Sequence, residues 1–215
     1  MTPLILGAAG FIGLNLFDAL AGRGVRARCG RRRRTNVLPL RSRKADMVMV
    51  ELDEPSSLEA AMDGVELVFH AAGHYPRFSL NPEEALRTGR RQMKNVLDAA
   101  AGAGVRRVVY VSTTATVAPS EGGASDESHV YDSSPGIGSY HDLKWEMERI
   151  AASEDRLQVV TACPAGCLGP WDLRFGTSAL LVAVAHGMKP AHPDGVVNLV
   201  DARDVGAGLA ALGTM

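Results

Sequence analysis

The chain has 215 residues, of which 46% are apolar and 22% are charged, and its formal net charge is -1 at pH 7. This length and apolar content suffice for one α/β domain with a buried core, and the near-zero charge excludes a globally basic nucleic-acid-binding protein. Three cysteines without metal-ligand spacing indicate neither a disulfide framework nor a metal site. No apolar run approaches the ~20 residues of a membrane span, so we expect a soluble, unprocessed, cytoplasmic protein with no membrane partner.

A glycine-rich turn follows the first apolar run of the chain, Leu4 to Leu6. Gly7, Gly10 and Gly13 are spaced three residues apart, and a helical pattern begins directly after them. In such a strand, turn and helix, the first glycine permits the tight turn, the second lets a phosphate approach the backbone, and the third lets helix pack on strand. The turn therefore predicts a pyrophosphate-binding site, although glycine-rich turns also close ordinary strand–helix corners.

Strand and helix patterns alternate along the rest of the chain. Apolar runs predict five more strands, at residues 25–29, 47–52, 67–70, 108–112 and 157–163. Periodic patterns predict helices at 14–20, 55–62, 83–101 and 139–153 and another that begins at Asp204, with a serine available to cap the helix at 55–62. The alternation predicts a doubly wound parallel α/β sheet with right-handed crossovers.

Ligands of such a sheet bind at the carboxyl ends of its strands. The segments that follow the predicted strands are Gly7 to Gly13, Arg31 to Arg34, Asp53, Ala71 to Gly73, and Ser112 to Thr114. We expect all of them to face one crevice. Asp53 can also act as the N-cap of the helix that begins at Pro55.

Tyr140 and Lys144 stand four residues apart at the start of a predicted helix, and therefore on one face of it. A free tyrosine has a pKa near 10, and a nearby ammonium lowers that pKa because it favours the phenolate. The hydroxyls of Ser112 to Thr114 can hydrogen-bond a substrate oxygen while the proton moves. Together these groups predict an acid/base site. Taken singly, a Tyr–Lys pair can be a solvated helix face, and strand-end hydroxyls can be caps.

Five segments, taken together, match the motifs of one superfamily. They are Gly7-x-x-Gly10-x-x-Gly13, His70-Ala71-Ala72-Gly73, Val109-Tyr110-Val111-Ser112-Thr113, Tyr140-x-x-x-Lys144, and Pro164 with Gly169-Pro170. Over essentially its whole length the chain resembles the extended short-chain dehydrogenase/reductases, in the dihydroflavonol-reductase-like and epimerase/dehydratase branch. The resemblance implies a Rossmann-like fold, an NAD(P)-dependent oxidoreductase acting on a small molecule, and homodimer formation.

The resemblance also implies residue roles. Tyr140 is the general acid/base, and Lys144 binds the nicotinamide ribose and lowers the tyrosine pKa. A strand-end hydroxyl supplies the third group. Counting strand register from Tyr110 places it at Thr113, with Thr114 as the alternative if the strand bulges. The implied cofactor contacts are Gly7, Gly10, Phe11, Ile12, Gly13, Arg31, Arg32, Asp53, Ala71, Ala72, Lys144 and Pro164. Among them, Asp53 matches the position from which the family contacts adenine. Tyr75 is a candidate for substrate contact, and His70 is interpreted as a packed core residue.

Four arginines, Arg31 to Arg34, follow the predicted second strand. An NAD-preferring site carries an acid there for the ribose 2′-hydroxyl, whereas a 2′-phosphate requires an arginine. No acid occurs between Val25 and Asn36. We therefore expect NADP in preference to NAD, with Arg31 or Arg32 as the contact, although such a run can also be a solvated loop.

The chain departs from the superfamily pattern in three places. Gly89, Gln92 and Met93 replace an asparagine-containing motif that supports the catalytic lysine, and Leu143 replaces a serine. The C-terminal part of the relatives is lacking, so we expect one NAD(P)-binding domain over 1–215, with 164–215 as the start of the substrate-binding part. Two alternatives to a reductase stay open, a nucleoside-diphosphate-sugar epimerase or dehydratase using the same site and a non-catalytic NADP-binding redox sensor. The substrate also stays open.

Overall fold

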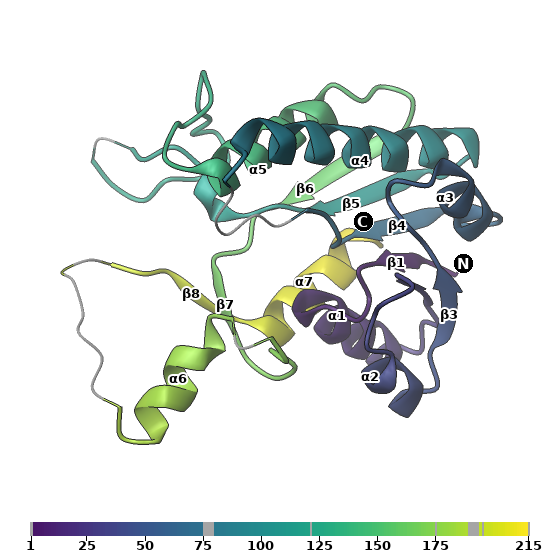
Figure 1. The fold of residues 1–215 in the computed structure, drawn as a ribbon, viewed down its shortest axis with the longest axis horizontal. Helices are drawn as coiled ribbons and strands as arrows, with labels where there is room; N and C mark the ends of the chain where they lie inside the picture. Colours follow the sequence, from purple (N-terminus) through teal and green to yellow (C-terminus); the bar gives the residue numbers. More distant parts are fainter. Residues whose placement is uncertain are drawn as a thin grey trace.

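A six-stranded parallel sheet forms the centre of the computed structural model, which describes residues 2–74, 80–120, 122–174, 176–188, 194 and 196–214 (Figure 1). The strand order β3-β2-β1-β4-β5-β6 switches direction between β1 and β4. The strands are β1 (Leu4–Leu6), β2 (Arg28–Arg31), β3 (Asp46–Met49), β4 (Leu67–His70), β5 (Arg107–Val111) and β6 (Gln158–Ala162). The predicted doubly wound α/β fold is confirmed, and its switch point marks where a ligand is expected.

The described residues form seven α-helices, six of which cover the two faces of this sheet. They are α1 (Phe11–Gly22), α2 (Leu38–Ser42), α3 (Pro55–Met62), α4 (Pro82–Gly102), α5 (Ser139–Ala152), α6 (Ser178–Ala185) and α7 (Ala202–Leu212), with the 3-10 turn η1 (Thr114–Thr116). α3, α4 and α5 pack on one face, and α1, α2 and α7 pack on the other (Figure 1). Within the described ranges, no helix is long and apolar enough to cross a membrane.

The central strands β1 and β4 are buried along their whole length. Their side chains alternate between the two faces, so Leu4 and Leu6 pack with α3 and α4 while Ile5 packs with α1 and α7. A third cluster joins Tyr110 of β5 to α4 and α5. Continuous apolar runs in the sequence therefore correspond to strands covered on both sides.

Strands β2 and β3 differ from their predicted positions. β2 begins at Arg28, because Val25 closes the turn after α1 by donating its N–H to the carbonyl oxygen of Leu20, at 3.0 Å. β3 ends at Met49, and the apolar residues after it are buried in the following loop. As a result, Arg31 is the last residue of β2 rather than part of the loop beyond it.

Two short strands, β7 (Gly166–Leu168) and β8 (Leu199–Asp201), form a second parallel sheet that the sequence patterns did not predict. α2 and α6 were not predicted either. The helix predicted to begin at Asp204 begins at Ala202 instead, with Asp201 as its N-cap. This helix, α7, packs closely on α1, since a Cβ at Gly206 would lie 2.6 Å from the carbonyl oxygen of Asn15.

The cap predicted for α3 is wrong. Glu54 occupies the N-cap position and makes no side-chain cap hydrogen bond. Ser57 lies inside the helix, and its hydroxyl exchanges hydrogen bonds with the backbone N–H and C=O of Glu51. Asp53 does not cap α3 either, because its carboxylate is bound by side chains of α4.

Candidate cofactor-binding and active site

The glycine turn at the end of β1 leaves no room for side chains. Gly7 has a φ of 83°, which strains any other residue, and a Cβ there would lie 2.6 Å from the carbonyl oxygen of Ala71. Gly10 donates its N–H to the carbonyl oxygen of Gly7 at 2.9 Å and forms the N-cap of α1. A Cβ at Gly13 would lie 2.2 Å from the same oxygen. The first and third glycines therefore have the turn and packing roles that their spacing predicts.

The start of α1 suits an anion. The first helical hydrogen bond runs from the N–H of Leu14 to the carbonyl of Gly10, so the N–H groups of Phe11, Ile12 and Gly13 have no acceptor within the helix. The first turn carries no acidic side chain, and the helix dipole adds positive potential there. N–H groups without a helical acceptor, beside a turn of glycines, fit the pyrophosphate of a dinucleotide.

The arginine run lies at the end of β2, next to this turn. Arg31 is half-buried, whereas Arg32 is exposed. Arg33 is already paired, since its guanidinium lies 3.3 Å from Glu54 and its backbone N–H donates to Glu51 at 2.8 Å. Glu51 thus places a carboxylate beside this run. It comes from the loop after β3, outside the segment from Val25 to Asn36 that contains no acid. Arg31 and Arg32 remain the candidates for a 2′-phosphate.

Asp53 is held against α4 at the same edge of the sheet. Arg91 Nε donates to its Oδ1 and Gln92 Nε2 donates to its Oδ2, both at 2.9 Å. These bonds fix the carboxylate in the loop after β3. Its contact with adenine stays a prediction.

Lys144 of α5 reaches the carboxyl end of β5. Its Nζ donates to the carbonyl oxygen of Val111 at 3.0 Å and to the hydroxyl of Tyr110 at 3.3 Å, and lies 5.0 Å from the centre of the Tyr110 ring. Burial lowers the pKa of Lys144 to about 8, against the opposing effect of the Glu148 carboxylate. Tyr140 is half-buried one turn earlier on α5. A readily titrated ammonium and a phenol thus share one helix face at the carboxyl edge of the sheet.

Tyr110 and His70 form a buried aromatic pair beneath Lys144. They lie opposite each other in β5 and β4, with ring centres 5.5 Å apart. Burial, and then the charge of Lys144, lowers the pKa of His70 to about 3, and burial raises the pKa of Tyr110 far above its usual value. Both are neutral at pH 7, so His70 is the packed core residue that the sequence predicts. Tyr110 was not singled out from the sequence, where it is one apolar-strand residue among several.

The two candidate threonines differ in what they do. β5 ends at Val111, so counting its register as far as Thr113 is not justified. Thr113 Oγ1 accepts the N–H of Ala115 at 3.2 Å and thereby caps η1. Thr114 has an exposed side chain, and its N–H donates to the carbonyl oxygen of Pro164 at 3.1 Å. Both threonines follow closely after Val111, whose carbonyl oxygen accepts a hydrogen bond from Lys144.

The residues that replace the superfamily asparagine have other roles. A Cβ at Gly89 would lie 2.2 Å from Cδ1 of Leu143, so this glycine lets α4 and α5 approach closely. Gln92 binds Asp53. The hydrogen bonds described for Lys144 go to β5 and none goes to α4. The hydrogen-bond partners described for Lys144 are therefore Tyr110 and the Val111 carbonyl, and not the α4 position where the superfamily carries its asparagine.

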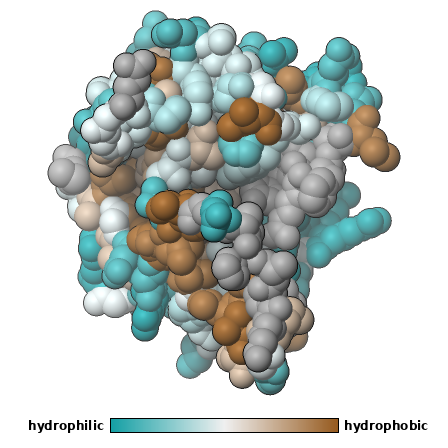
Figure 2. All heavy atoms as spheres, turned by 90° about the vertical axis from the view of Figure 1, so that its left-hand side faces the viewer, coloured by the Kyte–Doolittle hydropathy of each residue, from teal (hydrophilic) through white to brown (hydrophobic). Residues whose placement is uncertain are grey.

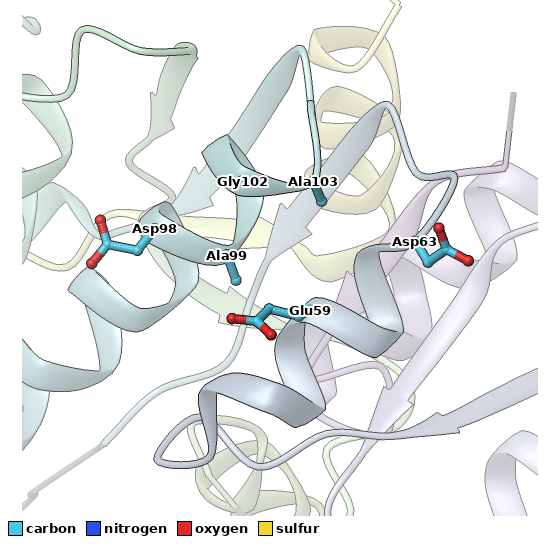
Figure 3. Close-up of a pocket in the computed structure, with 6 residues that line it drawn as sticks. All are labelled: Glu59, Asp63, Asp98, Ala99, Gly102 and Ala103. Atoms are coloured by element: carbon cyan, nitrogen blue, oxygen red, sulfur yellow. The ribbon is translucent and has the colours of Figure 1, made fainter.

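A cavity of about 390 Å³ opens between α3 and α4, and Figure 3 shows the residues around it. They are Glu59, Asp63, Asp98, Ala99, Gly102 and Ala103. Asp63 precedes β4 and Ala103 precedes β5, so this cavity lies at the amino-terminal edge of the sheet, away from the glycine turn. Its three carboxylates would repel a phosphate group, and it is not a candidate cofactor site.

Apolar side chains gather on the face shown in Figure 2. α6 contributes to this surface, because none of its residues is buried and Leu180, Leu181 and Val184 are each about half exposed. The part of the chain after β6 therefore offers apolar surface that the main sheet does not cover. Tyr75, the predicted substrate contact, lies outside the described residues.

Comparison with known proteins supports the motif-based resemblance. The chain matches the profile of the NAD dependent epimerase/dehydratase family over residues 3–204. A putative dihydroflavonol 4-reductase from Synechocystis is 30% identical over 95% of this chain and 60% of its own length. The chain thus spans 60% of the length of this curated relative.

Solved structures show the same fold. A nucleoside-diphosphate-sugar epimerase from Pseudomonas aeruginosa matches with a TM-score of 0.88 at 24% identity, over 100% of this chain and 68% of that protein. UDP-glucose 4-epimerase from Thermus thermophilus, determined in complex with NAD, matches with a TM-score of 0.82 at 21% identity, over 100% of this chain and 75% of that protein. The extended short-chain dehydrogenase/reductase resemblance is confirmed.

Proposed function

Because the chain belongs to the NAD dependent epimerase/dehydratase family, we propose that it is an NADP(H)-dependent oxidoreductase acting on a carbonyl or hydroxyl group of a small molecule. The cofactor, when bound, supplies or accepts hydride at C4 of its nicotinamide ring. The observation that carries the proposal is the position of Lys144. Its ammonium lies at the carboxyl end of β5, one turn from Tyr140, on the edge of the sheet that carries the glycine turn.

Each half of the proposed site has its own task. The N–H groups of Phe11, Ile12 and Gly13 bind the pyrophosphate. Lys144 binds the nicotinamide ribose, and its charge favours the phenolate of Tyr140. Tyr140 Oη gives a proton to the substrate oxygen during reduction and takes one during oxidation. The remaining proposed cofactor contacts are Asp53 at the adenine and Ala71, Ala72 and Pro164 near the nicotinamide.

We assign the hydroxyl that binds the substrate oxygen to Thr114 in preference to Thr113. Thr113 Oγ1 already accepts a backbone N–H within η1, whereas the Thr114 side chain is exposed beside Pro164. A hydroxyl engaged in capping has less freedom to follow the oxygen as its charge changes. This assignment replaces the first choice made from strand register.

The cofactor preference follows from Arg31 and Arg32. NADP(H) carries a 2′-phosphate that a guanidinium binds through charge-assisted hydrogen bonds. Titration of the protein with NADP and NAD should give tighter binding of NADP. Equal or tighter binding of NAD would contradict the preference while leaving the oxidoreductase proposal standing.

The acid/base assignment is tested by Tyr140→Phe, with Tyr131→Phe as the matched control. Tyr131 lies in the loop before α5 and contributes its backbone carbonyl to Trp145, so loss of its hydroxyl should change little. Tyr140→Phe should bind NADP(H) normally and lose turnover by about 10²- to 10⁴-fold. Unchanged turnover in this variant would exclude Tyr140 as the acid/base.

An epimerase is the second candidate, because its first step needs the same hydride and proton transfer. The sugar-nucleotide epimerases among the structural matches favour keeping it. A reductase oxidises one NADPH for each product formed, whereas an epimerase releases no oxidised cofactor. A redox sensor would bind the cofactor without catalysing either reaction. Its binding to a partner would not change in Tyr140→Phe.

We assign residues 164–215 to the start of the substrate-binding part. The exposed apolar residues of α6 support this assignment, because a substrate or a further segment of polypeptide could cover them. α7 belongs structurally with the main sheet, on which it packs beside α1.

A further inference from the structure

Glu148 lies one turn beyond Lys144 on α5, next to the proposed active site. Its Oε1 accepts a hydrogen bond from Thr116 Oγ1 at 2.6 Å and lies 3.7 Å from the Cys163 sulfur. Thr116 is only 4% exposed, so this contact is sheltered from water. The function proposed above gives Glu148 no task.

Thr116 is the last residue of η1, the turn that carries the candidate catalytic threonine. Its Oγ1 lies 2.7 Å from the carbonyl oxygen of Thr113 as well as 2.6 Å from Glu148, and the single hydroxyl proton is shared between these acceptors. The bond to Glu148 therefore joins η1 to α5. It links the element that presents the threonine to the helix that presents Tyr140 and Lys144.

The surroundings of Lys144 are otherwise poor in charge. His70 and Tyr110 are neutral, and burial raises the pKa of the Cys163 thiol to about 11, which keeps it protonated at pH 7. Glu148 is the carboxylate that acts on Lys144 within the described part of the chain. The groups around Lys144 are His70 from β4, Tyr110 and the Val111 carbonyl from β5, Cys163 after β6 and Glu148 from α5, and Tyr140 stands one turn earlier on the same helix.

We propose that Glu148 is a positioning residue of this active site, which holds η1 against α5 and places a carboxylate one helical turn from Lys144. The inference rests on the function proposed above, because it assigns a second layer of support to the same acid/base groups. Its two parts use different properties of one side chain. The hydrogen bond to Thr116 needs an acceptor oxygen, whereas the effect on Lys144 needs a negative charge.

These two properties can be separated by substitution. Glu148→Gln keeps an oxygen that can accept from Thr116 but removes the charge, and Thr116→Val removes the hydroxyl but keeps the charge. The amide can be accommodated, because Thr116, Glu148 and Cys163 line a cavity of about 140 Å³. Glu146→Gln is the matched control, since it removes the same charge two residues away, where Glu146 pairs with Arg90 on the protein surface.

Two measurements on the 215-residue chain test the proposal. The pKa of Lys144 is obtained from the pH dependence of its acetylation by acetic anhydride, with modification of the Lys144 peptide quantified by mass spectrometry. The pH profile of kcat is measured for each variant, together with its unfolding by urea. The first measurement needs no substrate, so it is independent of whether the proposed activity is correct.

Glu148→Gln should lower the pKa of Lys144 by about one unit and shift the pH profile of kcat in the same direction. Thr116→Val should leave the pKa of Lys144 unchanged and lower kcat by up to about 100-fold through misplaced geometry. Glu146→Gln should alter neither quantity. An unchanged Lys144 pKa in Glu148→Gln, or equal effects of both variants on both quantities, would overturn the proposal. If the wild-type protein shows no turnover with intact cofactor binding, the proposed function fails, while the acetylation result alone still decides the effect of Glu148 on Lys144.

Discussion

The glycine turn and the α5–η1 region lie at the same edge of the sheet but are built in different ways. The turn is made of backbone from seven consecutive residues, Gly7 to Gly13, and its shape depends on the absence of side chains. The α5–η1 region is made of side chains from β4, β5, η1 and α5, joined by hydrogen bonds and charge. We therefore expect atoms added to the turn to cause a large loss of stability and cofactor binding. Removing single groups from the α5–η1 region should cause smaller, graded changes in stability or kcat.

The largest effect is expected in the turn, from Gly13→Ala. The new Cβ would meet the backbone oxygen of Gly7 at 2.2 Å, which neither residue can relieve by a side-chain movement. We expect a loss of at least about 3 kcal/mol of unfolding free energy, together with loss of NADP(H) binding, measured by urea denaturation and cofactor titration.

Gly22→Ala is the control for this substitution, because Gly22 ends the same helix and nothing lies within 4 Å of its added Cβ. It should leave stability unchanged or raise it by up to about 1 kcal/mol. Similar behaviour of the two variants would show that close packing at Gly13 is not what the turn requires.

The next effect concerns the threonines of the α5–η1 region. Thr114→Val should lower kcat by about 10²-fold, the usual consequence of removing one hydrogen bond to a charged reacting oxygen, with little change in stability. Thr113→Val should act mainly on stability, by about 1 kcal/mol, since it removes the cap of η1. Both variants are measured by steady-state kinetics and urea denaturation. A larger loss of kcat in Thr113→Val than in Thr114→Val would reverse the assignment.

A smaller effect is expected where the turn meets β2. Replacing Arg31 and Arg32 together by alanine should weaken NADP binding by about 10- to 100-fold, through loss of charge-assisted hydrogen bonds, and leave NAD binding unchanged. Arg106→Ala controls for the loss of a single surface charge, because Arg106 lies at the opposite edge of the sheet, where it pairs with Glu66. Equal weakening of NAD and NADP binding would mean that the arginines act through the overall positive potential of the surface and do not bind the 2′-phosphate.

A further effect is the pH dependence of stability caused by Lys144. Its pKa is about 8 in the folded protein and 10.5 ordinarily, so between these values the unfolded chain binds more protons and the free energy of unfolding rises with pH. Cys29 and Cys163 have raised pKa values and act in the opposite direction above pH 9. The difference between wild type and Lys144→Met isolates the lysine, and it should rise from pH 8 to 10.5. A flat or falling difference would contradict the burial of the ammonium.

The difference between the two regions also decides how much of the fold and of the candidate site can be predicted from the sequence. The glycine turn is a local pattern, so Gly7, Gly10 and Gly13 and the elements on either side could be predicted from spacing alone. β2 was placed too early, because the apolar residue Val25 closes a turn rather than entering the strand. The short β7–β8 pair has too few residues for a periodic signal, and its strands are far apart in the chain.

The α5–η1 region was harder to predict, because its contacts join residues that are distant in the sequence. Tyr140 and Lys144 share one helix and were predicted from their spacing. Glu148 stands at the next helical turn and could have been noticed in the same way, but its partner Thr116 is 32 residues away. Asp53 was predicted to cap a helix or bind adenine, whereas its binding by Arg91 depends on the packing of α4, which no local pattern encodes.

The most direct test of the central claim is transfer of deuterium from NADPH labelled at C4 to a panel of aldehydes and ketones. The account predicts deuterium on the carbinol carbon of at least one product, formed with one NADP per turnover. It also predicts that Tyr140→Phe binds the labelled NADPH normally and loses the transfer. Intact NADPH binding without transfer by the wild-type protein, or undiminished transfer by Tyr140→Phe, would contradict the account.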